Sequence, residues 1–457
     1  MNKLENIKNI LVIGLGFRTG LAVSNFLIDE GFSVTVSDNK DAEALKDLID
    51  QLRPGVKSVT GPQNPDILDE GFDLVVLSPG VPQTIPLVKK ALEKKVPVVS
   101  EIELAYWFLK GDIIAITGTD GKTTTTSLVG HIFEKLGFDS FVGGNIGIPV
   151  VSFAKDTTDE SVTILELSSF QLETIESFRP TISAILNVSP DHLDRYDGMT
   201  GYRDAKARIF MNQQKDDYFI YLKNDNYIEE ILDTVPSQQL SFSIASENAD
   251  VFLNDNIITL KDKSEILSMN QLKIMGNHNA LNVMAAYLMV KSLCDKRNIS
   301  LNIDSFVRAC EDFEALEHRM EVVTSYKNRT FVNDSKATTI GSLLMAVNSL
   351  KENGILIMGG RTKGDDYSRL VSELKGKIKT LVLLGESRFD FDVLFKDFDR
   401  ELCETMDQAV EAAWKKSEEG DVIVLSPACA SFDLYKNYEE RGRHFKELVV
   451  KITGEVN

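Results

Sequence analysis

The chain has 457 residues, of which 43% are apolar and 26% are charged. The length exceeds one typical hydrophobic core and predicts two to four domains, while the composition excludes disordered and collagen-like chains. The formal net charge of -19 argues against a nucleic-acid-binding protein, because such proteins need a basic face. Any anionic ligand must therefore be held locally, by helix N-termini, a few Lys or Arg side chains and metal ions.

The ends of the chain and its cysteines bear on location. The N-terminal residues enter an apolar stretch almost at once, without the pattern of a signal peptide, and no apolar run approaches the roughly 18 residues that span a bilayer. The four cysteines are widely spaced and form no CxxC pair. We expect a cytoplasmic protein with reduced cysteines, no membrane insertion and no nucleic-acid partner.

Short apolar runs alternate with helical patterns over the first hundred residues. The runs are continuous rather than alternating in polarity, which predicts a parallel sheet covered on both faces. They lie at residues 9–16, 32–38, 57–61, 73–81 and 96–100. We predict a Rossmann-like α/β domain over residues 1–100.

Two further series of strands follow. The second begins at residue 112, continues through residues 161–169, 181–189 and 217–225, and closes at a helix over 277–294. It predicts a central P-loop ATPase-like domain with a mainly parallel sheet, residues 101–315. The third series, at 330–336, 354–366, 380–386 and 421–433, predicts a Rossmann-like C-terminal domain over residues 316–457 with ligand-facing loops at the carboxyl ends of its strands.

A glycine-rich loop follows the first strand. Gly14, Gly16 and Gly20 resemble a dinucleotide fingerprint, but the third glycine comes four residues after the second instead of three. The signal for NAD is therefore weak. The loop could hold a nucleotide diphosphate, with Asp38, Asn39 or Lys40 near a sugar or base, or it could be a structural tight turn.

The stretch "TGTDGKTTTT", residues 117–126, predicts a phosphate-binding loop between a strand and a helix. Its backbone amides would face phosphate oxygens, Lys122 would supply positive charge, and Thr123 would offer a hydroxyl to magnesium. Only two residues separate its glycines, where the usual P-loop has four. Four successive threonines are poor helix formers, so local preference does not explain them.

Polar residues follow two more strands of the central region. Glu166 ends an apolar strand, where burying a carboxylate is costly. Asn187, Asp191 and His192 follow the next strand, and with Glu166 they suit Mg2+ coordination or orientation of a reacting phosphate. His192 could equally be an ordinary surface residue. In the helical pattern over 202–210, Lys206 belongs to what is usually a solvated face.

The C-terminal region offers candidates on loops at strand ends. His318 and Arg319 precede the third series, while Asp334, Lys336 and Lys363 follow its strands. Small residues after Ser426 would permit close ligand approach, although tight packing between strand and helix explains them equally well.

Eight ordered motifs make the pattern as a whole similar to the Mur ligase family of peptidoglycan synthesis. They are TGTDGKTTT, ELSSFQLE, NVSPDHLDRY, YRDAKARIF, GNHNALNVMAA, EHRMEVV, VNDSKATT and SPACASFDLYKNYEERG. The resemblance implies an enzyme that uses ATP to activate a carboxylate as an acyl phosphate, which an amine then attacks to form an amide. The shortened GTxGKT loop is typical of the family.

Within the family, the resemblance implies the branch that adds D-glutamate to UDP-N-acetylmuramoyl-L-alanine. A sister ligase for another amino acid and a folylpolyglutamate synthetase are rivals, against which SPACASFD and the absence of a DNPR-type motif argue. A dehydrogenase would rest only on the first glycine loop. A non-catalytic nucleotide-binding protein would require the metal and lysine residues to be idle.

The resemblance assigns site residues by position. Lys122, His192 and Lys206 would be catalytic, with Lys206 carbamylated by CO2. Two Mg2+ sites would involve Thr123, Glu166, His192 and the Lys206 carbamate. The ATP site would comprise Gly118, Thr119, Asp120, Gly121, Lys122, Thr123, Thr124, Asn279, Asn282, Arg319 and Asp334.

The substrates would bind in the outer domains. The UDP-linked substrate would contact Gly16, Phe17, Arg18, Thr19, Asp38, Asn39, Lys40, Gly80 and Asn145. D-Glutamate would contact Lys336, Thr338, Lys363, Ser431 and Tyr438. The first glycine loop is one residue longer than the usual GLGxTG, and Tyr438 replaces a more usual phenylalanine. The family also implies a monomer that serves cell-wall biogenesis, cell shape and division.

Overall fold

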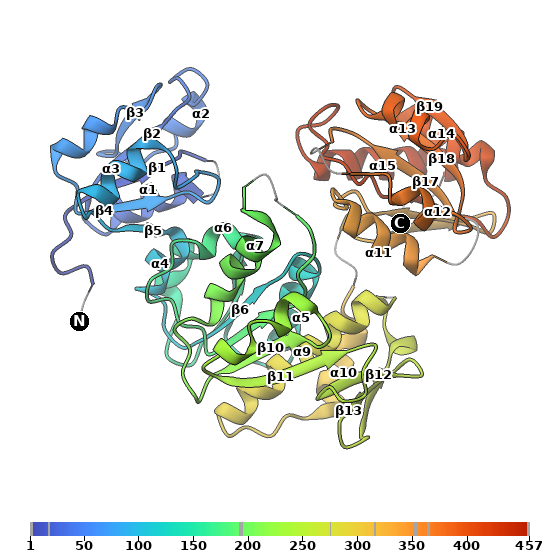
Figure 1. Ribbon diagram of the computed structural model, residues 1–457, viewed down its shortest axis with the longest axis horizontal. Helices are drawn as coiled ribbons and strands as arrows, with labels where there is room; N and C mark the ends of the chain where they lie inside the picture. The colour runs from blue at the N-terminus through green and yellow to red at the C-terminus, as the bar shows by residue number, and fades with distance from the viewer. Residues whose placement is uncertain are drawn as a thin grey trace. The chain divides into compact units, whose positions relative to one another are not determined.

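A computed structural model describes residues 3–16, 19–191, 195–274, 276–314, 317–350, 354–362 and 366–454. It contains three β-sheets, each flanked by helices (Figure 1). The expected three-domain α/β fold with mainly parallel sheets is confirmed. By contact density the chain forms two compact units, Met1–Gln271 with Ala280–Asp312, and Leu272–Asn279 with Phe313–Asn457.

The first sheet has five parallel strands in the order β3-β2-β1-β4-β5. Its strands are β1 (Asn9–Ile13), β2 (Ser33–Asp38), β3 (Lys57–Thr60), β4 (Leu74–Leu77) and β5 (Val98–Ser100). The helices of this region are α1 (Thr19–Asp29), α2 (Lys46–Ile49), α3 (Pro86–Glu93) and α4 (Glu101–Tyr106). All five strands agree with the apolar runs of the sequence.

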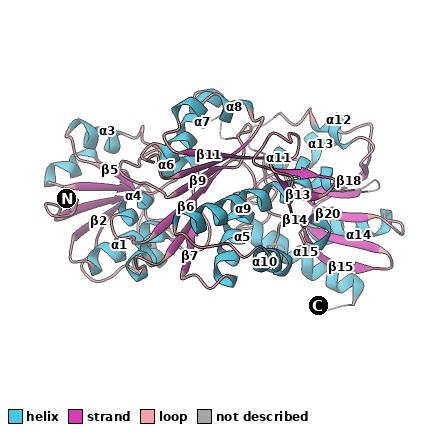
Figure 2. Cartoon of the chain, turned by 90° about the horizontal axis from the view of Figure 1, so that it is seen from below, coloured by secondary structure: helices cyan, strands magenta, loops and turns pink. Residues whose placement is uncertain are grey.

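Both faces of this sheet are buried, which explains its continuous apolar strands. Ile10 and Val12 of β1 pack in one core cluster with α1, whereas Leu11 and Ile13 pack in another with α3. Successive side chains of a strand point to opposite faces, so a sheet covered on both sides needs apolar residues at every position. Figure 2 shows α1 and α3 on opposite sides of the strands.

The central sheet has nine strands in the order β14-β13-β12-β11-β10-β9-β6-β8-β7. They are β6 (Asp112–Thr117), β7 (Ser140–Gly144), β8 (Val162–Glu166), β9 (Ile182–Ile185), β10 (Tyr218–Leu222), β11 (Gln238–Ser243), β12 (Val251–Asn254), β13 (Ile257–Leu260) and β14 (Glu265–Ser268). Across the sheet, neighbouring strands pair in parallel from β7 at one edge as far as β12. The strands β13 and β14 then pair antiparallel and form the other edge. Its helices are α5 (Lys122–Lys135), α6 (Ser169–Leu172), α7 (Gly198–Ala207), α8 (Asn226–Glu229), α9 (Asn277–Lys296) and α10 (Ile303–Asp312).

The C-terminal sheet has six strands in the order β15-β16-β20-β17-β18-β19, parallel except for the β15/β16 hairpin. They are β15 (Glu321–Tyr326), β16 (Arg329–Asn333), β17 (Gly354–Gly359), β18 (Ile378–Leu384), β19 (Asp399–Cys403) and β20 (Val422–Leu425). The helices are α11 (Ile340–Ser349), α12 (Leu370–Leu374), α13 (Arg388–Leu394), α14 (Met406–Lys416) and α15 (Tyr438–Thr453). Two core clusters again cover the two faces of this sheet.

The helix α4 joins the first sheet to the central one through a buried carboxylate. Glu103 is fully buried and accepts hydrogen bonds from the backbone amides of Glu176 at 2.9 Å and Phe178 at 2.8 Å, and from the Trp107 indole at 3.0 Å. The amide and hydroxyl of Ser177 donate to it as well. A buried charge is tolerated when several donors surround it, so Glu103 stabilises the contact between α4 and residues 176–178.

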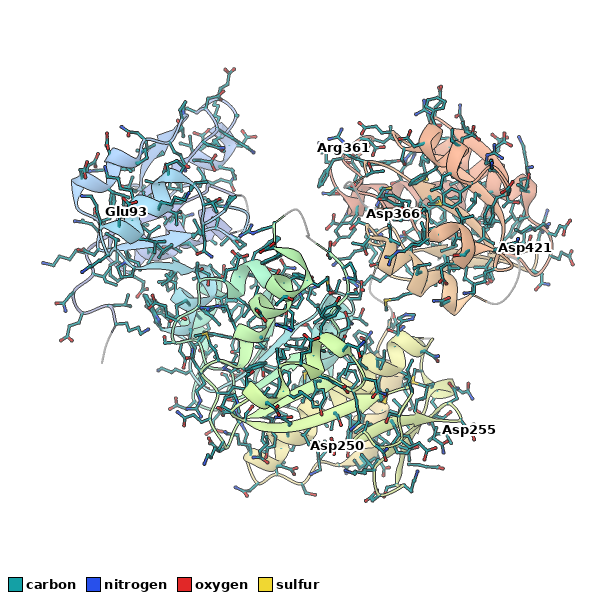
Figure 3. The ribbon with its side chains drawn as sticks, in the orientation of Figure 1. Glu93, Asp250, Asp255, Arg361, Asp366 and Asp421 are labelled. Carbon is teal, nitrogen blue, oxygen red and sulfur yellow. The ribbon has the colours of Figure 1, made fainter. Side chains whose placement is uncertain are left out.

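Acidic side chains are exposed on every part of the molecule. Glu93, Asp255 and Asp366 are examples on the three sheet domains (Figure 3). None of the helices in the described ranges is long and apolar enough to cross a membrane. The four cysteines are free and buried.

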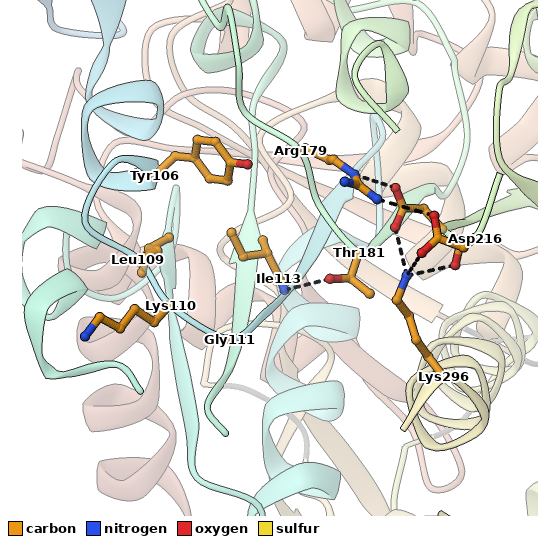
Figure 4. A pocket seen from close by; sticks show the side chains of 10 residues that line it. Tyr106, Leu109, Lys110, Gly111, Ile113, Arg179, Thr181, Asp216 and Lys296 are labelled. Carbon is orange, nitrogen blue, oxygen red and sulfur yellow. Dashed lines mark hydrogen bonds and ion pairs between the residues drawn. The ribbon is translucent and has the colours of Figure 1, made fainter. Parts of the chain in front are cut away.

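A pocket of about 490 Å³ opens at the amino end of β6 and β9, opposite the carboxyl ends of these strands (Figure 4). Four of its charged residues pair with one another. Arg179 contacts Asp217 at 2.8 Å, and Lys296 at the end of α9 contacts Asp216 and Asp217 at 3.0 Å each. The cluster ties three segments of the central domain together.

Candidate active site

The candidate site lies where β8, β6 and β9, three adjacent parallel strands, end. The carboxyl ends of parallel strands meet at one edge of a sheet, so residues that follow them converge there. The loop 118–121 follows β6, Glu166 ends β8, and Asn187 follows β9. The strand order therefore brings the loop, Glu166 and Asn187 to one edge of the sheet.

The phosphate-binding loop needs glycine at its last position. Gly121 precedes α5 with a φ of 81°, a conformation that side chains other than glycine disfavour. A Cβ there would also lie 2.6 Å from Oδ1 of Asn282. The same Asn282 oxygen accepts a 3.0 Å hydrogen bond from the buried Thr125 hydroxyl. Residues of α9 therefore pack directly against the loop, and the buried threonines of α5 are held by tertiary contacts.

Asn187 holds the loop from the other side. Its Oδ1 accepts hydrogen bonds from the amides of Thr119 at 3.1 Å and Asp120 at 2.8 Å, and its Nδ2 donates to the Asp120 carbonyl at 3.0 Å. The sequence analysis grouped Asn187 with candidate metal or phosphate ligands. In the structure its amide braces the loop backbone instead.

Two lysine amines meet at one carbonyl oxygen of the loop. Lys122 Nζ donates to Gly118 O at 2.9 Å and to Thr119 O at 2.7 Å, and Lys206 Nζ donates to the same Gly118 O at 2.7 Å. Lys206 lies on α7 and is 1% exposed, with its amine 4.2 Å from the centre of the Tyr202 ring. The interpretation of Lys206 as part of a solvated face is wrong, because α7 turns this side chain into the loop.

The surroundings of Lys206 favour its uncharged form. Burial, and then repulsion from Lys122, lower the pKa of Lys206 well below its usual value of 10.5. A neutral amine has the free electron pair that attack on CO2 requires. The geometry therefore suits the chemistry that the family resemblance implies for this residue.

Glu166 presents an unsatisfied carboxylate oxygen at the same edge. The side chain is 2% exposed, and Oε1 accepts a 2.7 Å hydrogen bond from Asn145 Nδ2. Oε2 is buried and has no hydrogen-bond partner within the described structure. Such an atom is costly unless a ligand binds it, and a hard cation such as Mg2+ prefers oxygen ligands.

Other residues suit a metal site with Glu166 in different degrees. Thr123 is 5% exposed at the start of α5. His192 lies outside the described residues. Among the described residues, no group of three or more His, Cys, Asp or Glu side chains gathers. The unpaired Glu166 oxygen is thus the feature that fits a bound cation.

The first glycine loop is held by its own domain. The Asp38 carboxylate accepts hydrogen bonds from the amides of Leu15 at 2.7 Å and Lys40 at 3.0 Å. A Cβ on Gly20 would lie 2.0 Å from Gly14 O, so only glycine fits there. The other expected contacts of this domain fall around these loops, namely Gly16, Thr19, Asn39 and Gly80, while Phe17 and Arg18 lie outside the described residues.

Other expected nucleotide residues lie on the loop after β16 and on α9. Asp334 follows β16 and is 7% exposed, with hydrogen bonds from Ser426 Oγ at 2.8 Å and Met320 N at 3.2 Å. Burial raises the pKa of Asp334 to about 7. Burial, with repulsion from Arg319, lowers the pKa of His278 to about 4. Asn279 and Asn282 are both buried and lie one turn apart on α9.

A buried arginine, Arg441, links the loops of Ser335 and Cys429, and the expected D-glutamate contacts Lys336 and Ser431 lie close to these residues in the chain. Lys336 Nζ lies 5.2 Å from the centre of the Tyr438 ring, and Ser431 is 2% exposed. Arg441 is also 2% exposed and donates to Ser335 O at 2.8 Å and Cys429 O at 3.2 Å, which links the two loops. Thr338 lies on the Lys336 loop, and Lys363 lies outside the described residues.

Arg441 lies within the motif SPACASFDLYKNYEERG, but the motif alone assigns it no role. Burial lowers the pKa of this guanidinium to about 10. Nothing in its spacing marked it, because it stands among other charged residues, Glu439, Glu440 and Arg443, at the start of α15. Its role depends on carbonyl groups that only the folded loops bring together.

Three family models match successive parts of the chain. They are a Mur ligase MurD-like N-terminal domain over residues 8–100, a Mur ligase middle domain over residues 116–290, and a Mur ligase glutamate ligase domain over residues 318–429.

Relatives match over nearly the whole length. The UDP-N-acetylmuramoylalanine--D-glutamate ligase of Koribacter versatilis is 41% identical over 450 residues, covering 97% of this chain and 98% of the relative. The enzyme of the same name from Clostridioides difficile is 38% identical, with the same coverage.

Solved structures share the fold. The UDP-N-acetylmuramate-alanine ligase MurC of Thermotoga maritima has a TM-score of 0.61 at 20% identity and covers 98% of this chain and 100% of its own. The MurF ligase of Thermotoga maritima in complex with ADP has a TM-score of 0.60 at 14% identity and covers 92% of this chain and 95% of its own. The domain matches and the full-length relatives together show that the chain belongs to the Mur ligase family.

Proposed function

We propose that this protein is an ATP-dependent ligase that adds D-glutamate to UDP-N-acetylmuramoyl-L-alanine in peptidoglycan precursor synthesis. The names of its full-length relatives support this substrate pair. The observation that carries the chemistry is the gathering of Lys122, buried Lys206 and the unpaired Glu166 oxygen at one edge of the central sheet. Such a site counters the repulsion between a substrate carboxylate and the γ-phosphate of ATP.

In the reaction, the terminal carboxylate of the UDP-linked substrate attacks the γ-phosphorus, and ADP leaves. The amine of D-glutamate then attacks the acyl phosphate carbon, a C–N bond forms, and inorganic phosphate leaves with loss of a proton. Lys122 exchanges its bonds to Gly118 O and Thr119 O for phosphate oxygens. Asn187 holds the amides of Thr119 and Asp120, and the amides of Gly121 to Thr124 at the start of α5 would face the same phosphates.

Lys206 would act as a carbamate. The neutral amine forms a bond to the carbon of CO2, one C=O electron pair moves to oxygen, and a proton leaves to solvent. The product places a negative charge beside Lys122, where burial and repulsion from Lys122 disfavour a protonated Lys206 amine. The burial of Lys206 then excludes water from the carbamate and slows its loss.

Two Mg2+ ions would be held by Thr123 and Glu166 at one site and by His192 and the Lys206 carbamate at the other. Bound there, Mg2+ supplies charge neutralisation for the γ-phosphate and the incoming carboxylate. The Oε2 atom of Glu166, buried and unpaired within the described structure, fits the first site. Asn145 orients that carboxylate through Oε1 and would also contact the muramoyl substrate.

The outer domains would bind the remaining groups. Residues 1–100 would hold UDP. The contacts would come from the backbone near Gly16, Thr19 and Gly80, and from the stretch Asp38–Lys40. Residues 101–315 would bind ATP, with Asn279 and Asn282 near adenine, and Arg319 and Asp334 would complete that site. Residues 316–457 would hold D-glutamate through Lys336, Thr338, Lys363, Ser431 and Tyr438.

The proposal also places the protein in the cytoplasm, where the nucleotide-linked precursor and ATP are available. We propose that it acts as a monomer, in support of cell-wall biogenesis, cell shape and division.

Phosphate release tests the function. Purified protein is incubated with ATP, Mg2+ and UDP-N-acetylmuramoyl-L-alanine, together with D-glutamate, L-glutamate, L-lysine or no amino acid. We expect release that depends on D-glutamate. Release with another amino acid would assign a sister activity, and no release under any condition would refute the ligase proposal.

A further inference from the structure

Glu173, just after α6, is a partly buried carboxylate on which three donors converge. It accepts hydrogen bonds from the Tyr196 hydroxyl at 2.6 Å, from Arg195 Nη2 at 2.8 Å and from Gln83 Nε2 at 3.2 Å. The side chains of Glu173 and Arg195 are only 15% and 19% exposed. A buried charge pair needs well-aligned donors, so this arrangement fixes all four side chains.

One branch of this network leads to the reaction centre. The rings of Tyr196 and Tyr202 lie 5.4 Å apart, and Tyr202 in turn lies 4.2 Å from Lys206 Nζ. The Tyr202 hydroxyl is 3.5 Å from Oγ1 of Thr119 in the phosphate-binding loop. Because burial and the bond to Glu173 raise the pKa of Tyr196 well above its usual value, Tyr196 stays a donor to the carboxylate. The position of the Tyr196 ring therefore limits where Tyr202, Lys206 and the loop can sit.

The other branch leads to the first domain. Gln83 and Pro79 belong to the loop that follows β4 at the carboxyl edge of the first sheet. Gln83 donates to Glu173, and Arg195 Nη1 donates to the Pro79 carbonyl at 3.5 Å. Arg195 also lies 4.0 Å from the centre of the Phe170 ring, so its planar group is held on two sides. Glu173 is thus the acceptor shared by a loop of the first domain and the ring pair beside Lys206.

We propose that Glu173 is a positioning residue that couples the first-domain loop 79–83 to the Lys206 side of the reaction centre through Tyr196 and Tyr202. The proposal rests on the ligase function proposed above. Glu173 touches no reacting atom in it. Its carboxylate sets the geometry of Tyr196, and the tyrosine pair transmits that geometry to Lys206 and Thr119.

The test is a double-mutant cycle of Glu173→Gln and Tyr196→Phe. The glutamine amide keeps the shape of the side chain but loses the charge, and it turns an N–H group either toward Arg195 and Gln83, which are donors, or toward the Tyr196 hydroxyl, whose hydrogen bond it would reverse. Tyr196→Phe removes the hydroxyl alone. The matched control is Glu176→Gln, a carboxylate three residues further on that is 55% exposed and lies 3.9 Å from Lys3 Nζ. Each variant is measured for kcat, for KM with each substrate, and for its thermal midpoint.

We expect Glu173→Gln and Tyr196→Phe each to lower kcat about tenfold, equivalent to about 1.4 kcal/mol, with KM for ATP unchanged. The double variant should be no slower than either single variant, because both break one link. Glu176→Gln should match the unmodified protein. Multiplicative losses in the double variant, or losses that follow the thermal midpoint, would show a merely structural role and overturn the proposal.

A second readout is independent of turnover. Limited acylation of Lys206 in CO2-free buffer, where the amine carries no carbamate, followed by mass spectrometry, measures how readily this buried amine reaches the reagent. We expect its rate relative to surface lysines to change at least threefold in Glu173→Gln and to stay constant in Glu176→Gln. If the unmodified protein turns over substrate and Glu173→Gln behaves identically to it in both assays, the positioning role is refuted and the ligase function remains intact. No turnover by any protein would instead refute the ligase function.

Discussion

Removing Lys206 gives the sharpest consequence of the site geometry. Lys206→Ala deletes a buried amine that donates to Gly118 O, but Lys122 still donates to that oxygen. The loop should therefore keep its conformation. The change loses about three buried methylenes, worth about 2.4 kcal/mol, while it also relieves the desolvation of the amine. These effects oppose each other, so we expect the thermal midpoint to shift by only about 5 °C or less.

The effect on activity should be far larger. If Lys206 supplies a preorganised negative charge as a carbamate, its removal should lower D-glutamate-dependent phosphate release by at least about 100-fold to 1000-fold, or roughly 2.7–4 kcal/mol. Lys215→Ala, which removes an exposed lysine after the same helix, is the control and should retain full activity.

Chemical rescue distinguishes the charge that is missing. The cavity left by Lys206→Ala should admit a short carboxylate, so acetate or formate should restore part of the activity in a saturable manner. Methylammonium should not. Near-normal turnover of Lys206→Ala without any additive would refute the carbamate, and rescue by methylammonium alone would show that the lysine acts as a cation.

Three further changes test other contacts. Glu103→Ala leaves several buried donors without an acceptor and should lower the free energy of unfolding in urea by about 3–5 kcal/mol. A loss below about 1 kcal/mol would contradict the account. Burial raises the pKa of Glu103, but the hydrogen bonds to its carboxylate lower it by more, so the folded pKa lies below the unfolded value of 4.5. The stabilisation by Glu103 should therefore be complete above pH 4.5 and disappear as the pH falls through the folded pKa. Asp334→Asn removes a carboxyl whose pKa rises from 3.8 to about 7, so the stability of the unmodified protein relative to this variant should fall as the pH rises between these values, and a pH-independent difference would contradict this. Asn187→Ala removes three hydrogen bonds to the phosphate-binding loop and should raise KM for ATP about tenfold; an unchanged KM would show that the loop holds itself.

Much of the fold could be predicted from the sequence because its strands are buried on both faces. Residues such as Ile10 to Ile13 are apolar without interruption, and that pattern has few alternatives. The edge strands β12, β13 and β14 were not predicted. They are four residues each and half exposed, so their pattern resembles that of a polar loop. The hairpin that starts the C-terminal sheet was missed in part for the same reason.

The candidate site, like the fold, could be predicted only in part from the sequence. The phosphate-binding loop and Glu166 were found from residues alone, because glycine, lysine and a strand-end carboxylate have few structural explanations. Lys206 was misplaced on a solvated face, since its burial depends on a loop 88 residues away in sequence. Glu173 carried no signal at all. Its partners come from two domains, and only the folded chain brings Gln83 and Tyr196 to one carboxylate.

Isotope transfer tests the central claim most directly. UDP-N-acetylmuramoyl-L-alanine is prepared with oxygen-18 in both oxygens of its alanyl carboxylate and incubated with the protein, ATP, Mg2+ and D-glutamate, and the released phosphate is analysed by mass spectrometry. An acyl phosphate must carry one labelled oxygen from the carboxylate into phosphate, so we predict one oxygen-18 per phosphate released, with release dependent on D-glutamate. Unlabelled phosphate would mean that ATP is hydrolysed without activating the carboxylate, and would contradict the account.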